Sequence, residues 1–79
     1  MIYSIWHVPS GNLVTTCESE RQALDLIRDG VAEHAPTYGE QFVLLEEDRL
    51  GRITRIAEGS ELVALALSAP PERAPSAQP

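Results

Sequence analysis

The side chains with the greatest chemical potential in this sequence are one cysteine and two histidines: Cys17, His7 and His34. A thiol beside an imidazole could act as a nucleophile with its general base. Such a pair works only within hydrogen-bond reach, with a third group to orient the base and a donor for the developing oxyanion. Nothing in the spacing requires these residues to meet. We therefore predict that Cys17 is a small hydrophobic strand residue, that no residue is catalytic, and that the protein is not an enzyme.

Side chains that could bind a metal are present, but their spacing matches no common type of site. His7, Cys17 and His34 lack the closely spaced ligand pairs of structural zinc sites. The acidic run at 46–48 could bind a divalent cation or share a proton. However, neighbouring strand residues point to opposite faces, and no calcium-loop spacing follows. We predict a solvated strand end and turn at 46–48, no metal site and no cofactor.

Arg49, Arg52 and Arg55 form a short basic stretch that could hold a phosphate or an acidic partner. The whole chain, however, carries a formal net charge of −6, from twelve acidic residues against six basic ones, all of them arginine. Such a surface repels the phosphate backbone, so nucleic-acid binding is disfavoured. We expect these arginines to solvate an edge strand and to pair with neighbouring acids.

Composition also bears on the compartment. One cysteine allows no intramolecular disulfide, which favours a reducing, cytoplasmic location. No apolar run approaches the roughly 18 to 20 residues that a membrane-spanning helix needs. The N-terminal stretch carries no basic residue before its apolar ones and lacks the layout of a signal peptide. We therefore expect a cytoplasmic protein that does not bind a membrane.

The first half of the chain predicts a hairpin and a helix. Residues 2–8 and 13–17 are rich in β-branched and aromatic types, and Gly11 lies in the turn between them. Ser19 with Gln22 forms a capping box for a helix that ends near His34, because Pro36 disfavours helical geometry just before it. Gly30 in mid-helix suggests a close approach to the sheet. The apolar positions follow the helical period: Ala23, Leu24, Ile27, Val31 and Ala35.

The second half predicts another hairpin. After a linking segment at 36–40, residues 41–47 and 52–58 read as strands, and the turn at 48–51 places Gly51 where a positive φ is needed. Residues 61–67 (ELVALAL) fit a short helix, although they could also form a fifth strand.

These elements predict an α+β fold of order ββαββ. The most apolar strands, the first and third, belong at the centre, which gives a four-stranded antiparallel sheet of order 2-1-3-4. One helix covers one face with Leu24, Ile27 and Val31, and a short C-terminal helix follows. We expect a single domain over residues 1–68. Residues 69–79 hold four of the six prolines and almost no large apolar side chain, which predicts a disordered Pro/Ala-rich tail.

Both faces of the first strand are mostly apolar, so one helix cannot cover them. If the helix takes the face with Ile2, Trp6 and Val8, the face with Tyr3, Ile5 and His7 remains. Either residues 61–67 fold back over it or a partner covers it. Apolar residues spread around the 61–67 helix favour a partner, most simply in a homodimer. The predicted interaction surface comprises Tyr3, Ile5, His7, Leu62 and Leu65.

Two stretches, SGNLVTTCESERQALDLIRDG and EDRLGRITRIAEGSELV, resemble small uncharacterised bacterial proteins of high-GC genomes, with hairpin–helix–hairpin domains of unknown function. The resemblance implies a fold and no activity. A more distant likeness is to small sheet-plus-helix antitoxins. The sequence thus predicts a small interaction or regulatory module that acts through protein–protein contacts. The alternative is an antitoxin-like or nucleic-acid-linked regulator that binds a basic partner.

Overall fold

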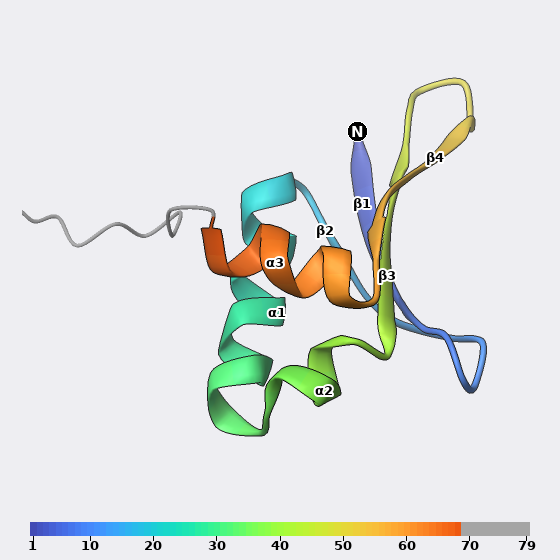
Figure 1. The fold of residues 1–79 in the computed structure, drawn as a ribbon. Helices are drawn as coiled ribbons and strands as arrows, with labels where there is room; N and C mark the ends of the chain where they lie inside the picture. Colours follow the sequence, from blue (N-terminus) through green and yellow to red (C-terminus); the bar gives the residue numbers. More distant parts are fainter. Residues whose placement is uncertain (69–79) are drawn as a thin grey trace, which may run out of the picture.

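The computed structural model describes residues 1–68, so the tail expected at 69–79 lies outside the described residues. Two hairpins flank the main helix, as the sequence predicts (Figure 1). A short helical turn and a C-terminal helix complete the described chain. In order, the elements are β1 (Ile2–His7), β2 (Asn12–Cys17), α1 (Glu20–Glu33), α2 (Pro36–Gly39), β3 (Phe42–Glu47), β4 (Ile53–Glu58) and α3 (Ser60–Ser68).

The four strands form one antiparallel sheet in the order β2-β1-β3-β4, which confirms the predicted α+β fold and strand order. All three helices lie on the same side of this sheet (Figure 1). The C-terminal segment is helical, which settles the choice between a helix and a fifth strand. None of the helices in residues 1–68 has the length and apolar character needed to span a bilayer.

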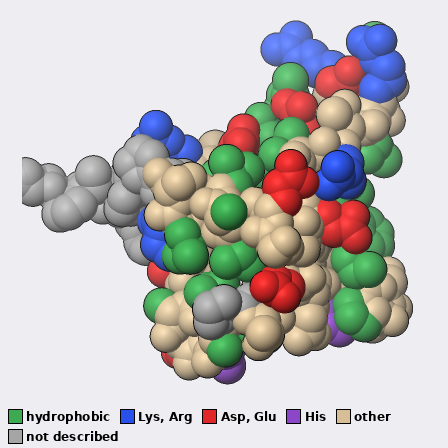
Figure 2. Space-filling view, in the orientation of Figure 1, with side chains coloured by type: hydrophobic (Ala, Val, Ile, Leu, Met, Phe, Trp, Pro, Cys, Tyr) green, Lys and Arg blue, Asp and Glu red, His purple; other side chains and the backbone are tan. Residues whose placement is uncertain are grey.

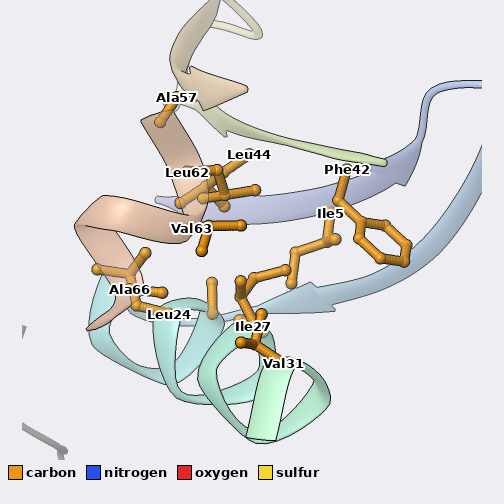
Figure 3. Packing of buried hydrophobic residues seen from close by; sticks show 12 residues of the cluster. Ile5, Leu24, Ile27, Val31, Phe42, Leu44, Ala57, Leu62, Val63 and Ala66 are labelled. Atoms are coloured by element: carbon orange, nitrogen blue, oxygen red, sulfur yellow. The ribbon is translucent and has the colours of Figure 1, made fainter. Parts of the chain in front are cut away.

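The helices cover the face of the sheet that carries Ile5. Ile5 pairs with Thr15 of β2 and with Leu44 of β3, and Leu44 pairs in turn with Ala57 of β4. This row meets the buried side chains of two helices (Figure 3). Helix α1 contributes Leu24, Ile27 and Val31, and helix α3 contributes Leu62, Val63 and Ala66. The face with Ile2, Trp6 and Val8, which we expected the main helix to take, is therefore the one that the helices leave uncovered.

Helix α1 begins as its capping residues predict. The Ser19 hydroxyl accepts a hydrogen bond from the Gln22 amide at 3.1 Å. The Gln22 side chain accepts one from the backbone N–H of Glu18, also at 3.1 Å. The first contact satisfies an amide that has no partner inside the first turn, and the second ties Gln22 to the residue before the N-cap. The helix ends at Glu33, with His34 as its C-cap, in agreement with the predicted stop near His34.

The linking segment at 36–40 contains an unexpected helical turn, α2, which packs between α1 and α3. A Cβ on Gly39 would lie 2.7 Å from Val31 Cγ2 and 2.8 Å from Val63 Cγ2, so only glycine permits this approach. The close neighbour of Gly30 is likewise in α2. A Cβ there would lie 2.9 Å from a Tyr38 ring carbon, rather than against the sheet.

We predict that Ile27→Asp abolishes folding, because Ile27 is buried in the core whereas its neighbour Leu26 is 47% exposed. Loss of the buried side chain costs about 2–5 kcal/mol, and burial of a carboxylate adds to this. Small domains have only about 5–15 kcal/mol in total. A thermal melt followed by circular dichroism should show no cooperative transition for Ile27→Asp and a near-normal one for Leu26→Asp. A cooperative melt of Ile27→Asp would contradict the packing of α1.

The turn between β3 and β4 is held by the carboxylate of Asp48. One oxygen accepts hydrogen bonds from the backbone N–H groups of Arg52 at 2.9 Å and Leu50 at 2.8 Å, and the other accepts one from Arg52 Nε at 3.0 Å. These contacts, the Arg52 backbone bond above all, hold the pKa of Asp48 below its ordinary value of 3.8. A lowered pKa in the folded state means that the stabilisation is present above pH 3.8 and is lost below it.

Asp48→Ala should therefore lower the melting temperature at about pH 7, and the effect should become smaller as the pH falls through the lowered pKa of the native carboxylate. The measurement is the difference in melting temperature between the two chains across this range. A difference that stays constant with pH would show that the charge of Asp48 contributes nothing to the turn.

Candidate interaction surface

The predicted interaction surface is only partly exposed. Ile5 and Leu62 are 2% and 0% exposed, so neither is available to a partner. Tyr3 and Leu65 are half-buried and pack against the same core. Of the two possibilities that the sequence left open, the structure shows the internal one: α3 folds back over the Ile5 face within the monomer. The placement of Ile5 and Leu62 on an exposed surface was therefore wrong, because the helix layer covers this face.

Tyr3 and His7, at opposite ends of β1, are held by contacts within the chain. The Tyr3 hydroxyl donates a hydrogen bond to the Glu46 carboxylate at 3.2 Å. Burial, followed by this bond, raises the pKa of the Tyr3 phenol. The two ring nitrogens of His7 lie 2.8 Å from Ser10 Oγ and 2.9 Å from Gln41 Oε1. Both imidazole nitrogens of His7 are thus engaged where the first hairpin turn meets the start of β3.

The structure separates Cys17 from both histidines. Cys17 pairs with Tyr3, while His7 lies four residues further along β1, about 13 Å at the rise of a strand. His34 caps the far end of α1, whose fourteen residues span about 20 Å, and its ring lies tilted against that of Tyr38. Cys17 itself is buried, and burial raises the pKa of its thiol. Its surroundings therefore do not activate a nucleophile.

We predict that native Cys17 reacts with a disulfide reagent more than about tenfold more slowly than the same residue in the unfolded chain, since both burial and a raised pKa reduce the accessible thiolate. Absorbance of the released thiol, with and without denaturant at about pH 8, measures the two rates. Equal rates would mean that the start of α1 leaves Cys17 open to solvent.

Two of the three arginines and two of the three acidic residues of these runs have local partners. Glu46 lies on the helix-covered face beside Tyr3, while Glu47 lies on the opposite face, as strand alternation predicts. Arg52 pairs with Asp48 at 3.0 Å, and Arg55 pairs with Glu61 at 3.3 Å. Within residues 1–68, no group of three or more histidine, cysteine or acidic side chains is placed to hold a metal ion.

The opposite side of the sheet is an apolar area that no helix within residues 1–68 covers. On this side Trp6 lies between its strand partners Leu13 and Val43. In the next row Leu45 lies beside Ser4. In the row after that, Ile2 and Ile53 lie on either side of Glu47. Hydrophobic side chains follow this side of the sheet, on the right in Figure 2. We call this surface the open face and define it by Ile2, Trp6, Leu13, Val43, Leu45 and Ile53.

The open face is apolar at its centre and polar at its margin. Ile2 and Leu13 are each 49% exposed, and Ile53 is 65% exposed. A hollow of about 170 Å³ lies among these side chains. The indole N–H of Trp6 already donates to Ser4 Oγ at 3.1 Å, so the ring presents mainly carbon. No described helix or loop covers this surface, which makes it the strongest candidate for contact with another protein.

Sequence reasoning missed the open face because alternation favours neither face of β1. The strongest cue in the sequence is Trp6, whose indole would be expected to need a partner. Bulges at Val14 in β2 and at Ile56 in β4 further break the period of two. Comparison of the chain with protein-family models, curated proteins and solved structures gave no match. The case for a function therefore rests on the surface itself.

Proposed function

We propose that the protein is a non-enzymatic interaction module that acts through protein–protein contacts, with a second copy of the chain packed on the open face. The observation that supports this is the position of the exposed side chains of Ile2, Leu13 and Ile53 around a partly buried Trp6. Large aromatic anchors at the centre of an apolar patch contribute disproportionately to binding. The two sheets would stack about 10 Å apart, as the two layers of a sandwich do.

A second copy fits this face better than a strongly charged partner does. The margin carries both signs of charge, with Arg55 beside Leu45, Glu58 beside Val43, and Glu47 between Ile2 and Ile53. In a two-fold dimer the same surface of both copies meets. A margin with charges of both signs then avoids repulsion between like charges along the whole contact. The folded part is also short, and chains of this size bury a smaller share of their surface than larger domains. Association would increase the buried apolar surface of each copy. We place the protein in the cytoplasm, because a single buried thiol favours a reducing compartment.

The test is the oligomeric state of the full chain, measured by sedimentation between about 1 and 300 μM, a range that covers weak to moderate dimers. Wild type should reach twice its mass of 8.6 kDa. Ile53→Arg should remain a monomer, because it places a charge in the contact. The monomer tolerates this change, since Ile53 is exposed and pairs with Glu47 across the strands.

Leu67→Arg is the matched control, because Leu67 is exposed on α3, away from the open face. This variant should dimerise like wild type. The emission of Trp6, the only tryptophan, should shift to shorter wavelength on dimerisation in wild type and Leu67→Arg but not in Ile53→Arg. A wild-type chain that stays at 8.6 kDa throughout, or equal dimerisation of Ile53→Arg, would refute the dimer on this face.

A further inference from the structure

A second concave surface lies between the outer edge of β2 and helix α1. Two adjoining hollows of about 480 and 330 Å³ share Thr15 and Leu26. One hollow is flanked by Asp25 and Asp29 of α1, and the other by the apolar side chain of Val14. We call this continuous surface the β2–α1 groove. None of the six residues that define the open face lines the groove, and only Thr16 lines both the groove and the hollow of the open face, so binding in the groove does not require the dimer.

The strand that forms one wall of the groove is an edge without charged residues or proline. β2 is the outermost strand, and its six residues, NLVTTC, include no charge and no proline. The other edge strand, β4, carries Arg55 and Glu58. Charges, prolines and bulges are the usual means by which edge strands avoid pairing with other chains. The bulge at Val14 leaves residues 15–17 as the regular stretch, and this stretch borders the groove.

The other wall supplies two kinds of contact. Leu26 is 47% exposed and, with Val14 and Tyr38, forms an apolar pocket at one end. Asp29, one turn further along α1, is exposed and forms no salt bridge in the described part of the chain. The nearby Asp25 is paired with Arg28 at 3.1 Å. The groove therefore combines a strand edge with no outer neighbour, an apolar pocket and a carboxylate available to a cation.

We propose that the β2–α1 groove binds an extended segment of another protein that carries an aliphatic side chain and, two residues away, a lysine or arginine. The segment pairs with residues 15–17 as an added strand. Alternate side chains of a strand point the same way and lie about 6.7 Å apart, so one enters the pocket at Leu26 while the next meets Asp29. The net charge of −6 adds a general attraction for a basic segment.

A second copy of this chain is a poor occupant of the groove. Its own β2 contains no basic residue to meet Asp29. Its other edge strand, β4, carries Ile53 and Arg55 two residues apart, but Arg55 is already paired with Glu61 at 3.3 Å. A two-fold axis through paired β2 edges would also bring the acidic side chains of both α1 helices towards one another. Like charges across a contact disfavour the pairing. Charge complementarity thus points to a basic segment from a different protein.

The probe is a dye-labelled, end-blocked peptide of sequence TVTLTKVT, with TVKTLTVT to allow for the opposite strand direction. Binding to the full chain is followed by fluorescence anisotropy, and the site by amide chemical shifts. We expect binding by at least one peptide, with the largest shifts at residues 15–17 and around Leu26. Replacement of the peptide lysine by glutamate should weaken binding about tenfold, as expected for loss of one charged contact.

The variant Asp29→Arg should weaken the lysine peptide about tenfold and strengthen the glutamate peptide, because it reverses the charge of the groove. Glu33→Arg is the matched control. It makes the same change in net charge one turn further along α1, outside the groove, and should leave binding nearly unchanged. Ile53→Arg should bind the peptide like wild type, which separates this proposal from the dimer on the open face.

Four results would overturn the proposal. The first is no binding of either lysine peptide below about 1 mM, the weak end of specific recognition. The second is an equal loss with Asp29→Arg and Glu33→Arg, which would reduce the effect to net charge. The third is a set of amide shifts centred on the open face instead of β2. The fourth is a homodimer that pairs through β2 and dissociates when Leu26 is replaced by aspartate, because the occupant of the groove would then be a second copy of the chain.

Discussion

A sheet has two faces, and all three helices in residues 1–68 lie on the same one. β1 is apolar on both sides, so this arrangement divides its side chains unequally. Ile5 joins the fully buried centre of the core with Leu44 and Leu62, while Trp6 stays on the uncovered side. An apolar side chain left on a sheet face gains free energy only when another surface covers it. The exposed apolar patch thus follows from the position of all three helices on one face, and not from a few isolated apolar residues on the surface.

The choice of covered face depends on how well the helices fit one another as well as the sheet. Helices α1 and α3 pack together, and each contributes a fully buried alanine to the core, Ala23 and Ala66. Arg28 of α1 also donates a hydrogen bond to the Ala66 carbonyl at 3.0 Å, which ties the last turns of α3 to α1. Gly39 lets α2 close the remaining gap beside Val31 and Val63. Close packing of this kind selects one arrangement of the helices on the sheet, because a missing or extra methylene group disturbs the contacts of the whole core.

Local signals were sufficient to predict most elements of the fold. Gly11 and Gly51 adopt the positive φ values expected of the two hairpin turns, and Ser19 caps the main helix as its side chain predicts. The strand order followed from placing the two most apolar strands at the centre. In contrast, α2 is a single turn of four residues, too short for a periodic pattern. Its place depends on contacts made by Gly39 and Tyr38 with distant residues, which no local signal records.

The candidate surface was harder to predict, because it depends on a choice between two similar faces. The patterns of Ile2, Trp6 and Val8 and of Tyr3, Ile5 and His7 are almost equally apolar. What decides between them is the set of residues that pairing brings into each row, such as Phe42 beside His7 and Val43 beside Trp6. The bulges at Val14 and Ile56 shift these rows by one residue. Register, which is a property of two strands together, therefore determined the surface.

The two proposed contacts use different parts of the sheet and can coexist. Face-to-face packing covers Trp6 and Ile53, whereas strand addition uses the backbone edge of β2 and the side of α1. A two-fold dimer on the open face would therefore present two equivalent β2–α1 grooves, one on each subunit. A partner with two basic segments could then occupy both, and the second contact would form at the effective concentration set by its linker. In such an assembly each groove needs only a modest affinity for its segment. The two grooves of the dimer bind together more tightly than the short edge of residues 15–17 does alone.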